Sequence, residues 1–149
     1  MKFFATISLC ILLASCNNGG NEPASAQKTG SDSLMEEVMK GHNSGMAKME
    51  KIDAAKSKIQ HVIDSISGLT AGVQKNSSTY RMQLDSVFNR LSFASYAMEK
   101  WMNEFNMDTL KGNEDARMAY LKSEQSKIVK VNDLMIDGLK RADSLLKGK

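Results

Sequence analysis

The sequence has few of the residues that stabilise a fold by means other than helix packing. It contains two cysteines, one proline and only 6% aromatic residues. Both cysteines, Cys10 and Cys16, lie near the N-terminus, so the rest of the chain has no thiol for a disulfide, a zinc site or a catalytic nucleophile. No segment alternates between apolar and polar residues, which leaves no candidate strands. The composition, with 25% charged residues, therefore predicts an all-α protein.

The chain also lacks an excess of one charge, a long apolar run and a catalytic motif. Its formal net charge of +3 is too small and too evenly mixed to indicate nucleic-acid binding. It has no nucleophile–base set, no glycine-rich phosphate loop and no carboxylate–histidine zinc motif, so we expect that it is not an enzyme. The apolar run from Phe3 to Leu13 is too short to span a bilayer.

The first residues instead follow the order of a secretory signal peptide. Lys2 supplies a positive charge, the apolar run follows, and the sequence Leu-Ala-Ser-Cys that ends at Cys16 resembles the bacterial lipobox. There, signal peptidase II cuts before the cysteine, whose sulfur carries a diacylglycerol. We predict a lipoprotein signal peptide over 1–15 and lipidation of Cys16, which would anchor the protein to a membrane. The alternative is a plain secretory signal in which Cys16 is incidental.

A polar tether is predicted between this anchor and the folded domain. Residues 17–30 are polar, contain glycine and have few apolar side chains, which is typical of a flexible segment. Asn17 follows the anchor, and the enterobacterial sorting rule then favours the outer membrane, on its periplasmic or its surface face. We assign the lipidated cysteine and tether to 16–32 and the folded domain to 33–147.

Three segments of the domain have the apolar spacing of a helix. The first is expected to begin at Ser33, which forms a capping box with Glu36. Glycines and polar residues over 68–79 indicate a turn. The second segment alternates +4 and +3 steps. Its apolar positions are Tyr80, Leu84, Val87, Leu91, Ala94, Met98, Trp101 and Phe105.

The third segment follows a second turn at 106–112. Asn113 and the two acidic residues after it provide a helix cap and a negative first turn. The amides Gln125 and Asn132 lie beside its apolar stripe, either as solvated flanking positions or as a buried amide that fixes the register. The stripe comprises Met118, Leu121, Ile128, Val131, Met135, Leu139, Ala142, Leu145 and Leu146.

Three such helices bury their stripes together in an antiparallel up-down-up three-helix bundle, coiled-coil-like and roughly 50 Å long. We predict this architecture for a monomer. The alternative is an elongated helical hairpin that completes its core by forming a dimer.

Methionine is the abundant apolar residue, with eleven copies. Met35, Met39, His42, Met46 and Met49 are spaced +4, +3, +4 and +3, which is typical of an inward-facing helical seam. Two glycines, Gly41 and Gly45, bracket the histidine. They allow close approach of a neighbouring helix, let the helix fray, or leave room around the imidazole.

Antiparallel packing predicts which residues meet this stripe. A first turn centred near residue 72 places Met98 level with Met46 and Trp101 level with Asn43, whereas a second turn near residue 110 places Trp101 level with Ala119. One end of the bundle would then gather a set of soft side chains. They are Met39, His42, Met46, Met49, Met98, Trp101, Met102 and Met118.

This set has two interpretations. Thioethers and imidazole are suitable ligands for Cu(I) or Ag(I), and a tryptophan ring can cover such an ion. Methionine is also the adaptable filler of helical cores, and its sulfur packs well against an indole without any metal. The stripe is therefore either a soft-metal site or ordinary core.

Three segments resemble a family of small Bacteroidetes lipoproteins labelled "viral A-type inclusion protein". The segments are SLMEEVMKGHNSGMAKM, AMEKWMNEF and EDARMAYLKSEQSKIVKVNDLM. The matching residues are Val38, Met39, His42, Met46, Lys48, Met49, Trp101, Met102, Met118, Tyr120 and Leu121. The chain departs from the pattern at Asn43 and Lys100, which are acidic in the family, and at Ala47, which replaces proline. The resemblance implies the helical architecture and a shared role for the Met/His/Trp end, but it supplies no reaction.

The sequence is compatible with two functions. We expect a membrane-anchored envelope lipoprotein that acts as a non-enzymatic helical interaction or structural module, with an envelope protein as partner. The alternative is a periplasmic protein that binds Cu(I) or Ag(I) through its Met/His/Trp cluster.

Overall fold

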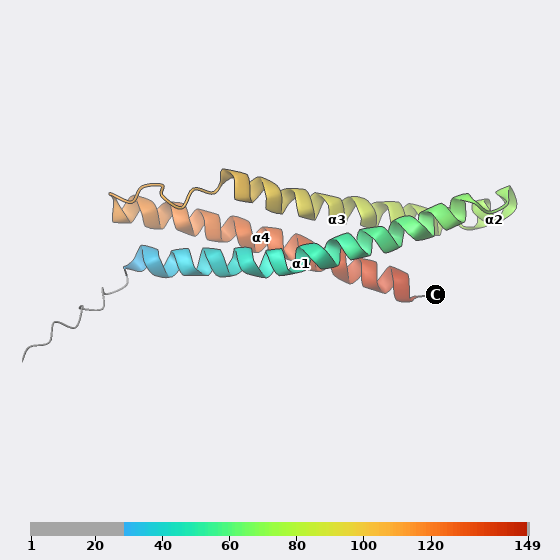
Figure 1. Ribbon diagram of the computed structural model, residues 1–149, viewed down its shortest axis with the longest axis horizontal. Helices are drawn as coiled ribbons and strands as arrows, with labels where there is room; N and C mark the ends of the chain where they lie inside the picture. The colour runs from blue at the N-terminus through green and yellow to red at the C-terminus, as the bar shows by residue number, and fades with distance from the viewer. Residues whose placement is uncertain (1–28, 149) are drawn as a thin grey trace, which may run out of the picture.

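The computed structural model describes residues 29–148, which form four helices and no strand (Figure 1). The helices are α1 (Gly30–Ser67), α2 (Ala71–Asn76), α3 (Ser78–Glu104) and α4 (Glu114–Lys147). The prediction of an all-α fold is confirmed for this part of the chain. The short helix α2 is an addition, and it lies within the predicted first turn.

The predicted signal peptide, the predicted lipidation site Cys16 and residues 17–28 of the predicted tether lie outside the described residues. Within 29–148, no helix combines the length and the apolar character needed to cross a membrane.

Helix α1 begins at Gly30, earlier than predicted, because Thr29 caps it. The Thr29 hydroxyl oxygen accepts a hydrogen bond from the backbone N–H of Asp32 at 3.2 Å, and the Asp32 carboxylate accepts one from the Thr29 N–H at 3.0 Å. This reciprocal pair satisfies N–H groups that the first turn of a helix leaves without partners. The predicted start at Ser33, capped with Glu36, is therefore wrong.

The three long helices lie side by side over most of their length (Figure 1). Helix α3 runs antiparallel to α1 and to α4, so α1 and α4 are parallel. Two contacts between each pair of helices fix these directions. Between α1 and α3, Lys56 contacts Phe88 and His42 contacts Met102; between α3 and α4, Trp101 contacts Glu124 and Arg90 contacts Asp137. Between α1 and α4, Ser31 contacts Glu114 and Gly41 contacts Asn132.

The core follows the stripes predicted for the second and third helices. The buried residues of α3 include Leu84, Leu91 and Met98, and those of α4 include Leu121 and Ile128. Aliphatic and thioether side chains fill the space between the helices, and burial of this apolar surface drives their association.

The buried line of α1 differs from the predicted Met/His seam. Val38, Gly45, Ile52 and Ile59 are buried at intervals of seven residues. Of the predicted seam, Met46 is 40% exposed, and the other members lie half-buried beside the buried line. They are Met35, Met39, His42 and Met49. The prediction is wrong about the centre of the seam because it assigned the seam to large side chains, whereas the buried line passes through Gly45.

The two glycines of α1 confirm the close-approach interpretation. A Cβ atom on Gly41 would lie 2.8 Å from Cγ2 of Ile128 on α4, and one on Gly45 would overlap Cε of Met98 on α3. The absence of a side chain therefore lets both neighbouring helices pack against the backbone of α1.

The register between α1 and α3 is the predicted one, and the register between α3 and α4 is not. Trp101 lies beside His42 as expected, but it reaches Glu124 on α4 and not the level of Ala119. The backbone of Phe105 is extended, and the segment 105–113 continues past the end of α3 before α4 begins (Figure 1). The first turns of α4 therefore project beyond α3, which displaces the pairing by more than one helical turn.

Candidate functional site

Four of the eight side chains that were predicted to gather line one hollow, which we call the Met/His pocket. Met39 and His42 come from α1, and Trp101 and Met102 come from the last turn of α3. The segment that follows α3, including Met107, completes the wall of a cavity of about 630 Å³. The pocket therefore lies where α1, the end of α3 and the α3–α4 connection meet.

The other predicted members lie elsewhere. Met46 is on the outer side of α1, Met49 packs against the core, and Met98 is fully buried under Gly45. Met118 packs beside Gly30, about three turns of α1 away from His42. The pocket therefore takes only four of the eight side chains, because the stripe is wider than one seam and α4 is displaced along α3.

His42 is the polar centre of the pocket. Its Nε2 atom lies 3.3 Å from the Met102 sulfur, and its Nδ1 atom lies 3.1 Å from the Asn43 side-chain oxygen. The imidazole and indole rings of His42 and Trp101 have centroids 5.8 Å apart and are tilted by 32°. One ring nitrogen thus faces a thioether across the helix interface, while the other has a polar neighbour on its own helix.

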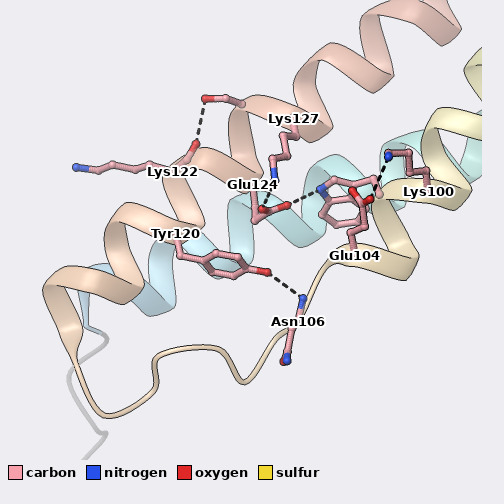
Figure 2. A network of polar contacts seen from close by, with 9 residues as sticks. Lys100, Glu104, Asn106, Tyr120, Lys122, Glu124 and Lys127 are labelled. Carbon is pink, nitrogen blue, oxygen red and sulfur yellow. Dashed lines mark hydrogen bonds and ion pairs between the residues drawn. The ribbon is translucent and has the colours of Figure 1, made fainter.

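Glu124 holds the indole from the opposite side. The Trp101 Nε1–H donates to Oε2 of Glu124 at 3.0 Å, and Lys127 donates to Oε1 at 2.7 Å (Figure 2). Glu124 is 4% exposed, and a buried carboxylate is tolerated only with such partners. The hydrogen bond to Glu124 is the main cause that raises the pKa of Lys127. The two bonds fix both the carboxylate and the indole plane.

Aromatic stacking continues from the indole into the α3–α4 connection. Phe105 stacks on Trp101 with ring centroids 4.8 Å apart, and Tyr120 lies parallel to Phe105 at 6.2 Å. The Tyr120 hydroxyl oxygen accepts a hydrogen bond from the Asn106 backbone N–H at 2.9 Å (Figure 2). The stack therefore ties the start of the connection to α4.

Arg117 holds the rest of the connection. Its side chain is 8% exposed, and Nη1 donates to the carbonyl oxygens of Met107 at 3.0 Å and Thr109 at 2.9 Å. A guanidinium can satisfy several carbonyls at once because it carries five N–H donors in a plane. The backbone of Met107, and with it the rim of the Met/His pocket, is therefore fixed to α4.

Trp101 also lines a second hollow, which we call the outer groove. Its lining combines apolar side chains of α3 and α4 with a charged rim, and its volume is about 380 Å³. Phe93 and Tyr96 are 55% and 57% exposed along it. Its lining residues are Phe93, Tyr96, Ala97, Lys100, Trp101, Glu104, Lys127 and Val131.

Three residues of the site, Glu124, Arg117 and Met107, were not predicted from the sequence. The signal for the first two was present: the stripe of α4 steps seven residues from Leu121 to Ile128, and Glu124 occupies the skipped position. Arg117 likewise precedes Leu121 by one helical turn. No periodic signal marks Met107, because it lies in the connection between two helices.

The arrangement offers thioether, imidazole and aromatic side chains for binding. Among residues 29–148, no three His, Cys, Asp or Glu side chains gather as ligands for a metal ion. Comparisons with family models, curated proteins and solved structures found no match to this chain.

Proposed function

We propose that the protein is a membrane-anchored envelope lipoprotein whose helical domain is a non-enzymatic module that binds an envelope protein. In this proposal the working unit is a monomeric up-down-up three-helix bundle, anchored through lipid on Cys16. The exposure of Phe93 and Tyr96 along the outer groove carries the proposal. Contiguous exposed aromatic surface on a soluble domain commonly marks an interaction site.

The outer groove has the composition of a protein interface. Ala97 and Val131 contribute apolar surface, and the two exposed aromatic side chains can supply anchor residues. At the rim, Lys100 forms an ion pair with Glu104 at 3.1 Å. An apolar centre with a charged rim favours a folded partner over a small polar ligand.

Site-specific photocrosslinking tests the proposal in the native envelope. A photoreactive phenylalanine analogue is placed at position 93 or 96 of the full chain, and at the exposed position of Glu50 on α1 as a control. We expect one discrete crosslinked protein from positions 93 and 96 that is absent from position 50. Phe93→Lys combined with Tyr96→Lys should abolish binding of that protein in purified form. Identical crosslinks from all three positions would contradict the proposal.

The anchor is tested separately. We expect wild-type protein to partition into detergent with acyl mass on Cys16, as the resemblance to small Bacteroidetes lipoproteins also implies. Cys16→Ser should release the protein from the membrane or leave it unprocessed. A Cys16→Ser protein that is cleaved and fractionates like wild type would refute lipid anchoring without affecting the partner surface.

A further inference from the structure

The Met/His pocket collects an unusual set of side chains for a cavity open to solvent. Three thioethers, from Met39, Met102 and Met107, and the imidazole of His42 line it together with the indole of Trp101. We propose that this pocket binds one soft monovalent metal ion, Cu(I) or Ag(I), with Met39, His42, Met102 and Met107 as its ligands. This goes beyond the partner-binding function and does not depend on it.

The spacing of the two central donors fits a shared ion. Nε2 of His42 and the sulfur of Met102 are 3.3 Å apart, on two different helices. At the distances known for zinc, about 2.0 Å to a nitrogen and about 2.3 Å to a sulfur, a near-tetrahedral angle at the ion separates those atoms by roughly 3.5 Å. The helix packing therefore holds an imidazole and a thioether at the separation that a bridging ion requires.

The chemistry of the donors selects the kind of ion. Thioether and neutral imidazole suit Cu(I) and similar soft ions, whereas hard cations require oxygen ligands. Glu104 and Asp108 do line the pocket, but each is engaged by a lysine: Glu104 by Lys100 and Asp108 by Lys111. The lysines neutralise the rim, so the pocket does not have the anionic character of a calcium or magnesium site.

Met107 is the ligand that distinguishes this proposal from a plain methionine stripe. It belongs to neither helix seam, and its side chain is 56% exposed, so it contributes little to the core. Arg117 nevertheless fixes its backbone carbonyl. Packing alone can explain a buried methionine, whereas Met107 lines the pocket beside Met39 and Met102 without belonging to the core.

Titration of the full-length chain with Ag(I), followed by equilibrium dialysis and by fluorescence, tests the site. Trp101 is the only tryptophan, so its emission reports on the pocket without a label. We expect one bound ion per chain and quenching or a shift of the emission. Glu50→Gln, on the exposed surface of α1, should bind Ag(I) like wild type.

Substitutions distinguish methionine and histidine side chains that bind the ion from those that only pack in the core. Met107→Leu, Met102→Leu and His42→Ala should each weaken Ag(I) binding by about tenfold or more, whereas Met46→Leu and Met82→Leu should leave it unchanged. Leucine keeps the volume of methionine, and circular dichroism melts verify that each variant is folded. Two results would overturn the proposal: no Ag(I) retained in dialysis, or Met46→Leu weakening binding as much as Met107→Leu.

Discussion

The two ends of the bundle are held together in different ways. Towards α2, the core contains Ile59, Ile63, Leu84 and Val87, and apolar burial accounts for the packing. Towards the N-terminus of α1, the interior contains a tryptophan, two helix glycines and the buried charges of Arg117 and Glu124.

The difference shows what folding alone requires of this chain. A buried ion with its partners is seldom more stabilising than well-packed apolar side chains. The polar end thus contains buried charged residues that stability alone does not require. The same end contains the Met/His pocket and borders the outer groove. The following substitutions test whether the two ends differ in this way.

The largest effect is expected in the aliphatic core. Leu91 is fully buried at the middle of α3, and Leu91→Ala should lower the free energy of unfolding by about 2–5 kcal/mol through lost burial and the cavity left behind. Urea denaturation followed by circular dichroism measures it. Met82→Ala, at a position 63% exposed on the same helix, should cost less than about 0.5 kcal/mol. Equal losses for both would show that α3 is not packed as described.

An intermediate effect is expected at the polar end. Glu124→Ala leaves the buried Trp101 N–H without its acceptor and should cost about 1–3 kcal/mol. Glu124→Gln retains an acceptor oxygen and should recover most of that loss. Trp101 emission, recorded with the unfolding curves, should change for the alanine variant and remain near wild type for glutamine. If the glutamine variant is as unstable as alanine, the charge of Glu124 matters more than its hydrogen bond.

The smallest effect concerns the junction of α1 with α4. The Glu114 carboxylate accepts hydrogen bonds from the backbone N–H of Ser31 at 2.9 Å and from its hydroxyl at 2.8 Å, and these two bonds, the backbone one first, lower the pKa of Glu114. Because the folded pKa lies below the unfolded value of about 4.3, this stabilisation is present above that pH and is lost as the pH falls through the folded pKa.

Glu114→Gln should therefore reduce the loss of stability on acidification below about pH 4.3, as measured by thermal melts across the acidic range. Glu50→Gln, a matched substitution on exposed α1 surface, should leave the acid dependence of the wild type. An identical acid dependence in all three proteins would mean that the Ser31 contact does not persist in solution.

Apolar periodicity predicted structure wherever it is regular. The second and third helices and the level of Trp101 beside His42 could be predicted, because regular spacing fixes both a buried face and a register across a short turn. Close approach at Gly45 was only one of three interpretations, since hydrophobicity scales give weight to side chains and not to the space that their absence leaves. The displacement of α4 depends on the path of the segment 105–113. This segment begins with extended backbone at Phe105, and no periodic pattern in the sequence predicts its path.

The candidate site was predicted only in part for related reasons. Met39, His42, Trp101 and Met102 meet because α1 and α3 are in the predicted register. Met118 does not join them because α4 is displaced along α3 relative to the predicted register. Glu124 was not predicted because it is a charged residue at a position where the helical repeat expects an apolar one. Such a position can hold a buried polar side chain that has a partner.

Trp101 forms a wall of both the Met/His pocket and the outer groove. An occupant of one hollow that changes the tilt of the ring also changes a wall of the other. Thermodynamic linkage then makes the influence mutual: if an ion in the pocket alters affinity at the groove, a bound protein alters affinity for the ion by the same factor. The Trp101 side chain, which Glu124 orients, is thus placed to couple binding at the pocket to binding at the groove.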